Sequence, residues 1–250
     1  MWFRVLGTLE VQRDDGTKTV IQQARLRSLL TVLLVNRGQV LSTEQLGSLL
    51  WGTDVPAKAD HAIHAYVSAL RRQLQPSELI KNKRPGYHLD LAPHLLDVDE
   101  FHELRDLGAS AFSAGDFSHA CILLDQACAL WRDPRLPDFP RTPLIQGAAA
   151  KLTAELNTAH DMLMDARLAI GQHREVIPVL RAKTTAQPDH ELAWTQLMIA
   201  LYHSEMRAMA LSVYLEAREA LRNVSGIDPG PSMRLLHEQM LHDVPSLQRP

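Results

Sequence analysis

The sequence has no apolar run approaching the roughly 18–20 residues that a membrane-spanning helix requires, so we expect no membrane partner. Its first residues, MWFRVLGTLEV, alternate like a strand and lack the basic and then apolar regions of an export signal. Cysteine occurs only at Cys121 and Cys128, in one apolar helical stretch. That spacing predicts two buried free thiols on one helix face. These features together predict a cytoplasmic protein.

The sequence also lacks the motifs of the common catalytic sites. The stretch DGTKT at residues 15–19 superficially resembles a phosphate loop, but G-x-x-x-x-G-K-[ST] is absent. His61 and His64 with Asp60 have no fourth metal ligand at a suitable spacing. No G-x-S-x-G or Cys/His nucleophile arrangement occurs. We therefore expect no enzyme, with no catalytic residues, no metal and no cofactor.

The charge of the chain is unevenly distributed. Residues 1–95 carry 12 lysines and arginines against 8 acidic residues, a net charge of +4, whereas residues 96–250 carry 14 against 21, a net charge of −7. The whole chain therefore has a net charge of −3. A mildly basic front part and an acidic back part indicate two modules with different partners, and an anion suits the first.

The front part changes from a strand period to a helical period and back. Residues 1–22 predict two or three short strands with a hairpin turn at Asp15-Gly16. Leucines then recur at helical spacing in ARLRSLLTVLLVNRG, which ends at Gly38. A second helix begins at the capping box that Ser42 forms with a glutamine three residues later.

A third helix and a hairpin complete this part of the chain. The helix is predicted from about Asp60 to Leu74, ending before Pro76, and residues 79–82 and 86–91 predict two strands around KRPG. Strands, three helices and a hairpin in this order predict a winged helix-turn-helix over residues 1–94.

Residues 97–250 predict an all-α domain of tetratricopeptide-like repeats. The unit GASAFSAGDFSHACILLDQACALWRDP returns twice, and the turn positions Gly171 and Glu205 are 34 residues apart, which is the period of that repeat. Between the units, DPRLPDFPRTP predicts an extended connector rather than a polyproline ligand. The predicted fold class is therefore mainly α with a small β component, an N-terminal winged helix-turn-helix followed by an all-α tetratricopeptide-like domain.

The third helix has two faces on a helical wheel. Ile63, Val67, Leu70 and Leu74 form the face that packs on the domain. The opposite face carries small and hydrogen-bonding residues: His61, His64, Ala65, Ser68 and Arg72, flanked by Ala69 and Arg71. Such a face suits a helix in the major groove of DNA, where small residues permit close approach and arginine reaches phosphates or guanine.

We therefore predict that this protein binds double-stranded DNA. Arg71 and Arg72 are the strongest candidates, with His61, His64, Tyr66 and Ser68 behind them. The hairpin adds Lys81, Lys83 and Arg84 as the wing, while Tyr87 is expected to pack beneath it, and Ser42 and Thr43 offer hydroxyls and backbone amides. Five or six neutralised phosphates per protomer predict a log–log salt slope of about −4.5 to −5.5.

Several stretches carry a resemblance to a known family across essentially all 250 residues. They are FRVLGTLEV, HAYVSALRRQL, RPGYHLDL, DVDEF, ACALWRD, ELAWTQLMIALYHS, ALSVYLEAREAL and GIDPGPSMRLLHEQML. The chain resembles the Streptomyces antibiotic regulatory proteins, in which an OmpR-type winged helix precedes a bacterial transcriptional activation domain.

The resemblance implies an activator of a secondary-metabolite (antibiotic) gene cluster. Such a protein binds direct repeats at promoters, is expected to form a homodimer on DNA, and recruits RNA polymerase holoenzyme including its sigma factor. It also implies a polymerase contact in the loop 51–59, for which the candidates are Trp51, Asp54 and Lys58.

Two departures from the family pattern bear on this expectation. Family members usually carry arginine where this chain has Ala69, and Glu205 replaces a turn glycine. If that turn needs a positive φ, Glu205 costs roughly 1 kcal/mol. Because Ala69 removes a DNA contact that the family pattern implies, a second function stays open: a protein-binding adapter with a degenerate winged helix. A third is a ligand sensor with a pocket in the helical domain.

Overall fold

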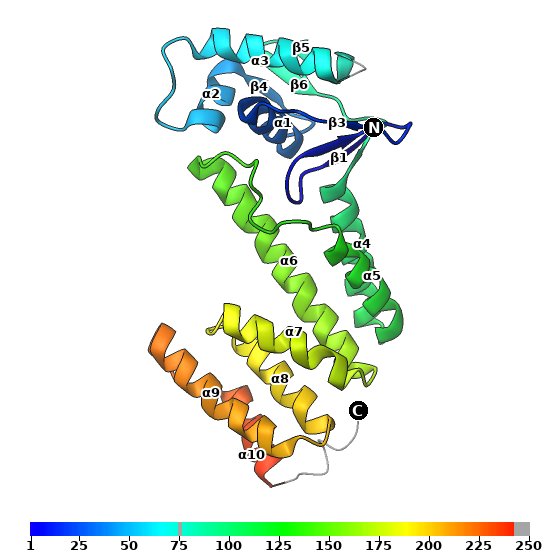
Figure 1. The fold of residues 1–250 in the computed structure, drawn as a ribbon, viewed down its shortest axis with the longest axis vertical. Helices are drawn as coiled ribbons and strands as arrows, with labels where there is room; N and C mark the ends of the chain where they lie inside the picture. Colours follow the sequence, from blue (N-terminus) through cyan, green and yellow to red (C-terminus); the bar gives the residue numbers. More distant parts are fainter. Residues whose placement is uncertain (75–76, 243–250) are drawn as a thin grey trace. The chain divides into compact units, whose positions relative to one another are not determined.

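The computed structural model describes residues 1–74 and 77–242 and confirms the predicted fold class (Figure 1). It forms two compact units. The N-terminal unit comprises Met1–Leu104 with Gln126–Asn157, and the C-terminal unit comprises Arg105–Asp125 with residues from Thr158 onward. The module boundary at residues 94–97 stays a prediction, because compact units follow packing and not the ancestry of each segment. Pro76 and residues 243–250 lie outside the described residues.

The chain begins with a small sheet. Its strands are β1 (Trp2–Arg4), β2 (Glu10–Gln12), β3 (Lys18–Thr19) and β7 (Leu95–Leu96), in the order β3-β2-β1-β7. Alternation places Phe3 and Val11 in the core, directly opposite each other. The three early strands and the turn at Gly16 are confirmed, whereas the two-residue β7, which pairs in parallel with β1, was missed.

Three helices follow as predicted: α1 (Ala24–Val35), α2 (Thr43–Trp51) and α3 (Ala59–Gln73). The apolar faces of all three are buried against one another, and α1 contributes the leucines at 26, 29, 30, 33 and 34. The Ser42 hydroxyl accepts from the backbone N–H of Gln45 at 3.1 Å, and the Gln45 side chain accepts from the Ser42 N–H at 2.9 Å. The predicted capping box therefore fixes the start of α2.

A second sheet forms the wing. After a short 3₁₀ turn (Ser77–Leu79), β5 (Ile80–Lys83) and β6 (Gly86–Leu89) pair as the predicted hairpin, which lies beside α3 (Figure 1). A third strand, β4 (Val40–Ser42), pairs with β6 and was not predicted. At three residues, β4 is too short to show an alternation of its own. It ties the wing to the residue that caps α2.

Two buried carboxylates join the first sheet to later parts of the N-terminal unit. Asp97, the first residue of α4 (Asp97–Ser113), accepts from the backbone N–H groups of Val5 and Leu6 at 2.9 and 3.0 Å. Arg132 lies 3.6 Å from the same carboxylate. Burial raises the pKa of Asp97, while the two amides and the guanidinium favour its ionised form.

The second carboxylate belongs to the proline-rich connector. Asp138 accepts from the Leu9 N–H at 2.7 Å and from Arg27 Nε at 2.7 Å. Thr142 donates to the Leu49 carbonyl at 2.8 Å, and both Leu136 and Phe139 are buried. The connector is therefore packed into the N-terminal unit and is not presented as a polyproline ligand.

The remaining helices show the predicted repeat. They are α5 (Phe117–Ala129), α6 (Pro143–Ala169), α7 (His173–Ala186), α8 (Glu191–His203), α9 (Arg207–Ser225) and α10 (Pro231–Leu241). In the C-terminal unit α7, α8 and α9 pack in sequence order, and α10 packs on α8 and α9 (Figure 1). None of the described helices is long and apolar enough to cross a membrane.

The turns of the repeats share one backbone geometry. Gly115, Gly171 and Glu205 all have positive φ, at 79°, 82° and 65°, and each lies two residues before the next helix. In each turn the following residue donates its N–H to the carbonyl five residues earlier, the bond of a Schellman motif. Glu205 therefore occupies a left-handed position that its two counterparts fill with glycine.

The two cysteines differ from the prediction in burial. Both Cys121 and Cys128 are free, as expected, but each is half-buried in α5 rather than fully buried. Burial still raises the pKa of the Cys121 thiol. A short helix packed on one side leaves the flanks of its apolar face partly open, which the spacing of two residues does not reveal.

Replacing Asp97 with alanine should destabilise the N-terminal unit by roughly 2–5 kcal/mol, because the buried amides of Val5 and Leu6 lose their acceptor. The matched control is Asp99→Ala on the same helix, where a solvent-exposed ion pair with Arg37 is worth less than about 1 kcal/mol. Chemical denaturation followed by circular dichroism measures both. Equal losses in the two variants would contradict the role given to Asp97.

Replacing Glu205 with glycine should raise the free energy of unfolding by about 1 kcal/mol, because glycine adopts the left-handed conformation without a Cβ penalty. In contrast, Glu219→Gly within α9 should lower it by about 1 kcal/mol. Thermal unfolding of the two variants and the parent chain tests whether the two substitutions change the free energy of unfolding in opposite directions.

Candidate nucleic-acid interface

The exposed face of α3 matches the helical-wheel prediction. Ile63, Val67 and Leu70 are buried against the domain. The outward residues are exposed along the helix: His61, His64, Ala65, Ser68 and Arg72. They span about 16 Å of helix at 1.5 Å per residue. The Ser68 hydroxyl donates to the His64 carbonyl at 2.8 Å, which leaves its oxygen open to an outside donor.

Arg71 has partners inside the domain. Its Nε and Nη2 donate to the Ile80 carbonyl at 2.9 and 2.6 Å, and Nη2 also donates to Asn82 Oδ1 at 2.9 Å. The guanidinium carbon lies 5.8 Å from the centre of the Tyr87 ring. Arg71 therefore joins the end of α3 to strand β5. Its direct contact with DNA stays a prediction, and Asn82 is a partner that nothing in the sequence identified.

His64 makes a second link between α3 and the wing. Its Nδ1 is hydrogen-bonded to the Tyr87 hydroxyl, and the two rings meet edge to face with centroids 5.9 Å apart. Tyr87 is buried as expected, and that burial raises its pKa above the ordinary value, so the phenol remains protonated. His64 thus presents part of its ring outward while the other part fixes the orientation of the helix against β6.

Gly86 allows β6 to approach β4 closely, just before the start of α2. A Cβ at this position would lie 1.9 Å from the Leu41 carbonyl oxygen and 2.6 Å from Ser42 Cα, so no larger residue fits. The close approach leaves a hollow of about 300 Å³ bounded by three elements. Its lining residues are Thr43, His64, Asn82, Lys83, Arg84, Pro85, Gly86 and Tyr87.

The basic residues of the wing divide into two kinds. Lys81 donates to Asp90 Oδ2 at 2.8 Å, and this hydrogen bond raises the pKa of Lys81. By contrast, Lys83 and Arg84 at the hairpin tip are exposed and, within residues 1–74 and 77–242, have no ion-pair partner; the same holds for Arg72. Three cations of the predicted set are thus available to an outside anion. The sequence could not separate them from Lys81, because the partner of Lys81 is Asp90, which the hairpin brings beside it from the end of the neighbouring strand.

The N-terminus of α2 borders the same hollow. Thr43 is half-buried there, and Ser42 is occupied by the capping box, although its hydroxyl keeps a proton to donate. Backbone amides of a helix N-terminus attract anions. The exposed Glu44 in the first turn opposes this attraction, so Thr43 and Ser42 suit a positioning contact more than a source of affinity.

The polymerase candidates lie at the other end of α2. The Trp51 ring lies 6.4 Å from that of Tyr66, both half-buried, so this pair fixes the start of the α2–α3 loop against α3. Asp54 and Lys58 are exposed in that loop. Tyr66 is consequently turned toward Trp51, away from the row that His61, His64 and Ser68 form.

Replacing Arg71 with lysine should loosen the wing, because an ammonium cannot reproduce the fork on the Ile80 carbonyl and Asn82. A loss of about 1.5 kcal/mol corresponds to roughly tenfold faster amide hydrogen exchange in β5. Exchange in α1 should be unchanged. The control is Arg72→Lys, because Arg72 is next in sequence and exposed; it should leave the hydrogen exchange of β5 unchanged. Identical exchange profiles for the two variants would contradict the link between Arg71 and β5.

The comparisons with known proteins agree with this geometry. Residues 96–241 match the family described as "Bacterial transcriptional activator domain", and residues 17–89 match "Transcriptional regulatory protein, C terminal". Transcriptional regulatory protein MoaR1 of Mycobacterium tuberculosis is 31% identical over 249 residues, covering 97% of this chain and 80% of its own length. Regulatory protein DnrI of Streptomyces peucetius is 29% identical over 259 residues, covering 100% of this chain and 95% of its own.

A solved structure shows the same fold over nearly the whole chain. The structure titled "Mycobacterium tuberculosis EmbR in complex with low affinity phosphopeptide" is 32% identical, with a TM-score of 0.87 over 97% of this chain. This chain spans 65% of that protein. With an OmpR-type winged helix followed by a bacterial transcriptional activator domain, the chain belongs to the Streptomyces antibiotic regulatory protein family of transcriptional regulators.

Proposed function

We propose that this regulator is a sequence-specific DNA-binding activator with no catalytic activity. The observation that carries the proposal is an exposed face of α3 that borders a cationic hairpin. The outward face runs from His61 to Arg72, and at His64 it borders the hollow that Lys83 and Arg84 also line. Arg72, Lys83 and Arg84 have no ion-pair partners among the described residues. A helix with small and polar outward residues beside a cationic hairpin suits the major groove and an adjacent phosphate backbone.

The division of the basic residues changes the expected strength of binding. Lys81 is paired with Asp90, and Arg71 is engaged by the Ile80 carbonyl. About three phosphates per protomer are then neutralised, which gives a log–log salt slope of about −2.7 for each protomer bound. This is shallower than the slope of about −4.5 to −5.5 that five or six neutralised phosphates would give.

We infer the arrangement on DNA from the resemblance to the family. Two protomers would bind a direct repeat head to tail, with half-sites about 10–11 bp apart, one turn of the double helix. The promoter would be that of a secondary-metabolite (antibiotic) gene cluster. The exposed loop with Asp54 and Lys58, held by the Trp51–Tyr66 pair, would contact RNA polymerase holoenzyme and its sigma factor.

Selection from a random duplex library with the full chain, followed by a salt titration on the selected sequence, tests the proposal. We expect enrichment of a direct repeat and a slope near the value above. Arg72→Ala should weaken binding by about 1–3 kcal/mol, and Arg84→Ala should make the slope shallower by about 1 per protomer.

Arg174→Ala is the matched control, because Arg174 is an exposed arginine in α7 of the C-terminal unit. It should change neither the affinity nor the slope. No enriched sequence, or equal affinities of Arg72→Ala and the parent chain, would overturn the proposal and favour the protein-binding adapter that Ala69 leaves open.

A further inference from the structure

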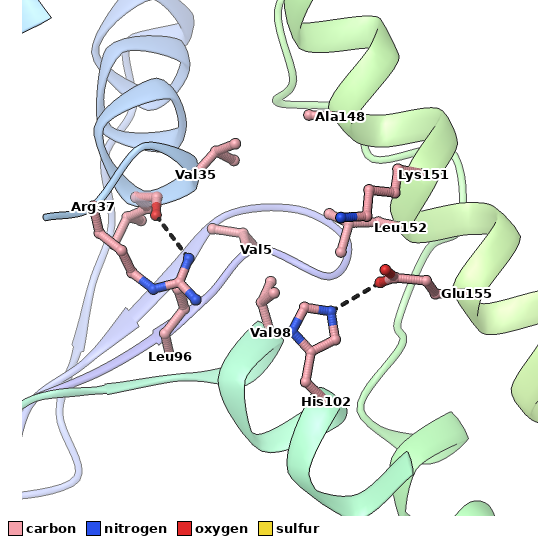
Figure 2. A pocket seen from close by; sticks show the side chains of 11 residues that line it. Val5, Val35, Arg37, Leu96, Val98, His102, Ala148, Lys151, Leu152 and Glu155 are labelled. Carbon is pink, nitrogen blue, oxygen red and sulfur yellow. Dashed lines mark hydrogen bonds and ion pairs between the residues drawn. The ribbon is translucent and has the colours of Figure 1, made fainter. Parts of the chain in front are cut away.

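The N-terminal unit contains an apolar cavity away from the wing. Its volume is about 150 Å³, and Figure 2 shows lining side chains that converge from Val5 just after β1, from the end of α1, and from β7, α4 and α6. The buried apolar lining residues are Val5, Leu34, Leu96, Val98 and Leu152. Five lining residues that are partly or fully exposed are called its mouth below: Arg37, His102, Ala148, Lys151 and Glu155.

The size of this cavity sets the size of an occupant. Protein interiors are close-packed and leave few voids larger than a water molecule. An apolar cavity of about 150 Å³ is large enough to bind benzene. It is well below the several hundred Å³ of a drug-sized pocket. A single six-membered ring or a short branched chain therefore fits, and a larger molecule does not.

The charges at the mouth set the chemistry of the occupant. Arg37 is engaged, since its Nη1 donates to the Leu34 carbonyl at 3.4 Å and its Nη2 forms an ion pair with Asp99. His102 Nε2 lies 2.8 Å from Glu155. Lys151 is exposed and has no hydrogen-bond or ion-pair partner within the part of the chain that the structure describes. Figure 2 shows its ammonium turned from α6 toward the cavity.

We propose that this cavity is a binding site for a small monocarboxylate that bears one ring or one branched chain. The apolar part lies among Val5, Leu34 and Leu152, and the carboxylate pairs with Lys151 at the mouth. The ring or branched chain of such a ligand would bury its apolar surface in the cavity, away from water. Its carboxylate would form an ion pair with Lys151. This site goes beyond the proposed function, because its occupancy is measured on the free protein without DNA.

Benzoate is the probe, and benzamide, of the same shape without the charge, is the matched ligand. Titration of the full chain followed by ¹H–¹⁵N chemical shifts should show saturable shifts at Val5, Leu34 and Lys151 with benzoate. Lys151→Gln should weaken benzoate about threefold to fivefold, as expected for a partly exposed ion pair, and leave benzamide unchanged. Equal benzoate affinities in Lys151→Gln and the parent chain would overturn the assignment of the carboxylate.

A second pair of variants tests the cavity itself. Ala148→Leu narrows the mouth and should lower the affinity for both ligands at least tenfold, whereas Ala150→Leu, exposed on the same helix, should leave it unchanged. Lys151→Gln is a surface substitution, so it decides the question even if Ala148→Leu folds poorly. Absence of saturable benzoate binding to the parent chain, or undiminished binding to a folded Ala148→Leu variant, would overturn the site.

Discussion

The fold of the N-terminal unit depends on buried carboxylates that accept hydrogen bonds from backbone amides of the first sheet. Asp97 accepts hydrogen bonds from the N–H groups of Val5 and Leu6. Asp138 accepts hydrogen bonds from the N–H group of Leu9 and from the Arg27 side chain. A buried amide without an acceptor is costly, so each carboxylate fixes where its own segment lies against the sheet. The winged helix is consequently completed by residues that follow it in sequence, from the start of α4 and from the connector before α6.

Hydrogen bonding within the unit also shapes the surface that we propose binds DNA. The side chains that orient the wing, chiefly Arg71 on the Ile80 carbonyl and His64 on Tyr87, are engaged within the domain. The cations at its edge, Arg72, Lys83 and Arg84, have no ion-pair partner among the residues that the structure describes. The inner side chains hold the wing in place and the outer cations are free to contact an anion. The surface is therefore preorganised, because the wing need not be ordered at the moment of binding. Residue type alone does not distinguish the two sets.

Much of the fold followed from local pattern. The spacing of the leucines predicted α1, the capping box at Ser42 predicted the start of α2, and Asp15-Gly16 predicted the first hairpin turn. A helical-wheel projection also predicted the outward face of α3. Strands β4 and β7 were missed, since two or three residues carry no readable alternation and their partners are distant in sequence. The roles of Arg71 and Lys81 depend on neighbours across the wing, Asn82 and Asp90, which no spacing along the chain indicates.

The sequence by itself determined the order of elements, the two-part organisation and the repeat whose turns fall at Gly115, Gly171 and Glu205. Each of these rests on interactions between residues close along the chain, where periodicity, capping and turn chemistry act. Only the tertiary structure decided which cations remain available and that an apolar cavity opens beside Lys151. Both are set by packing and hydrogen bonding between distant segments, and these interactions leave no periodic trace in the sequence.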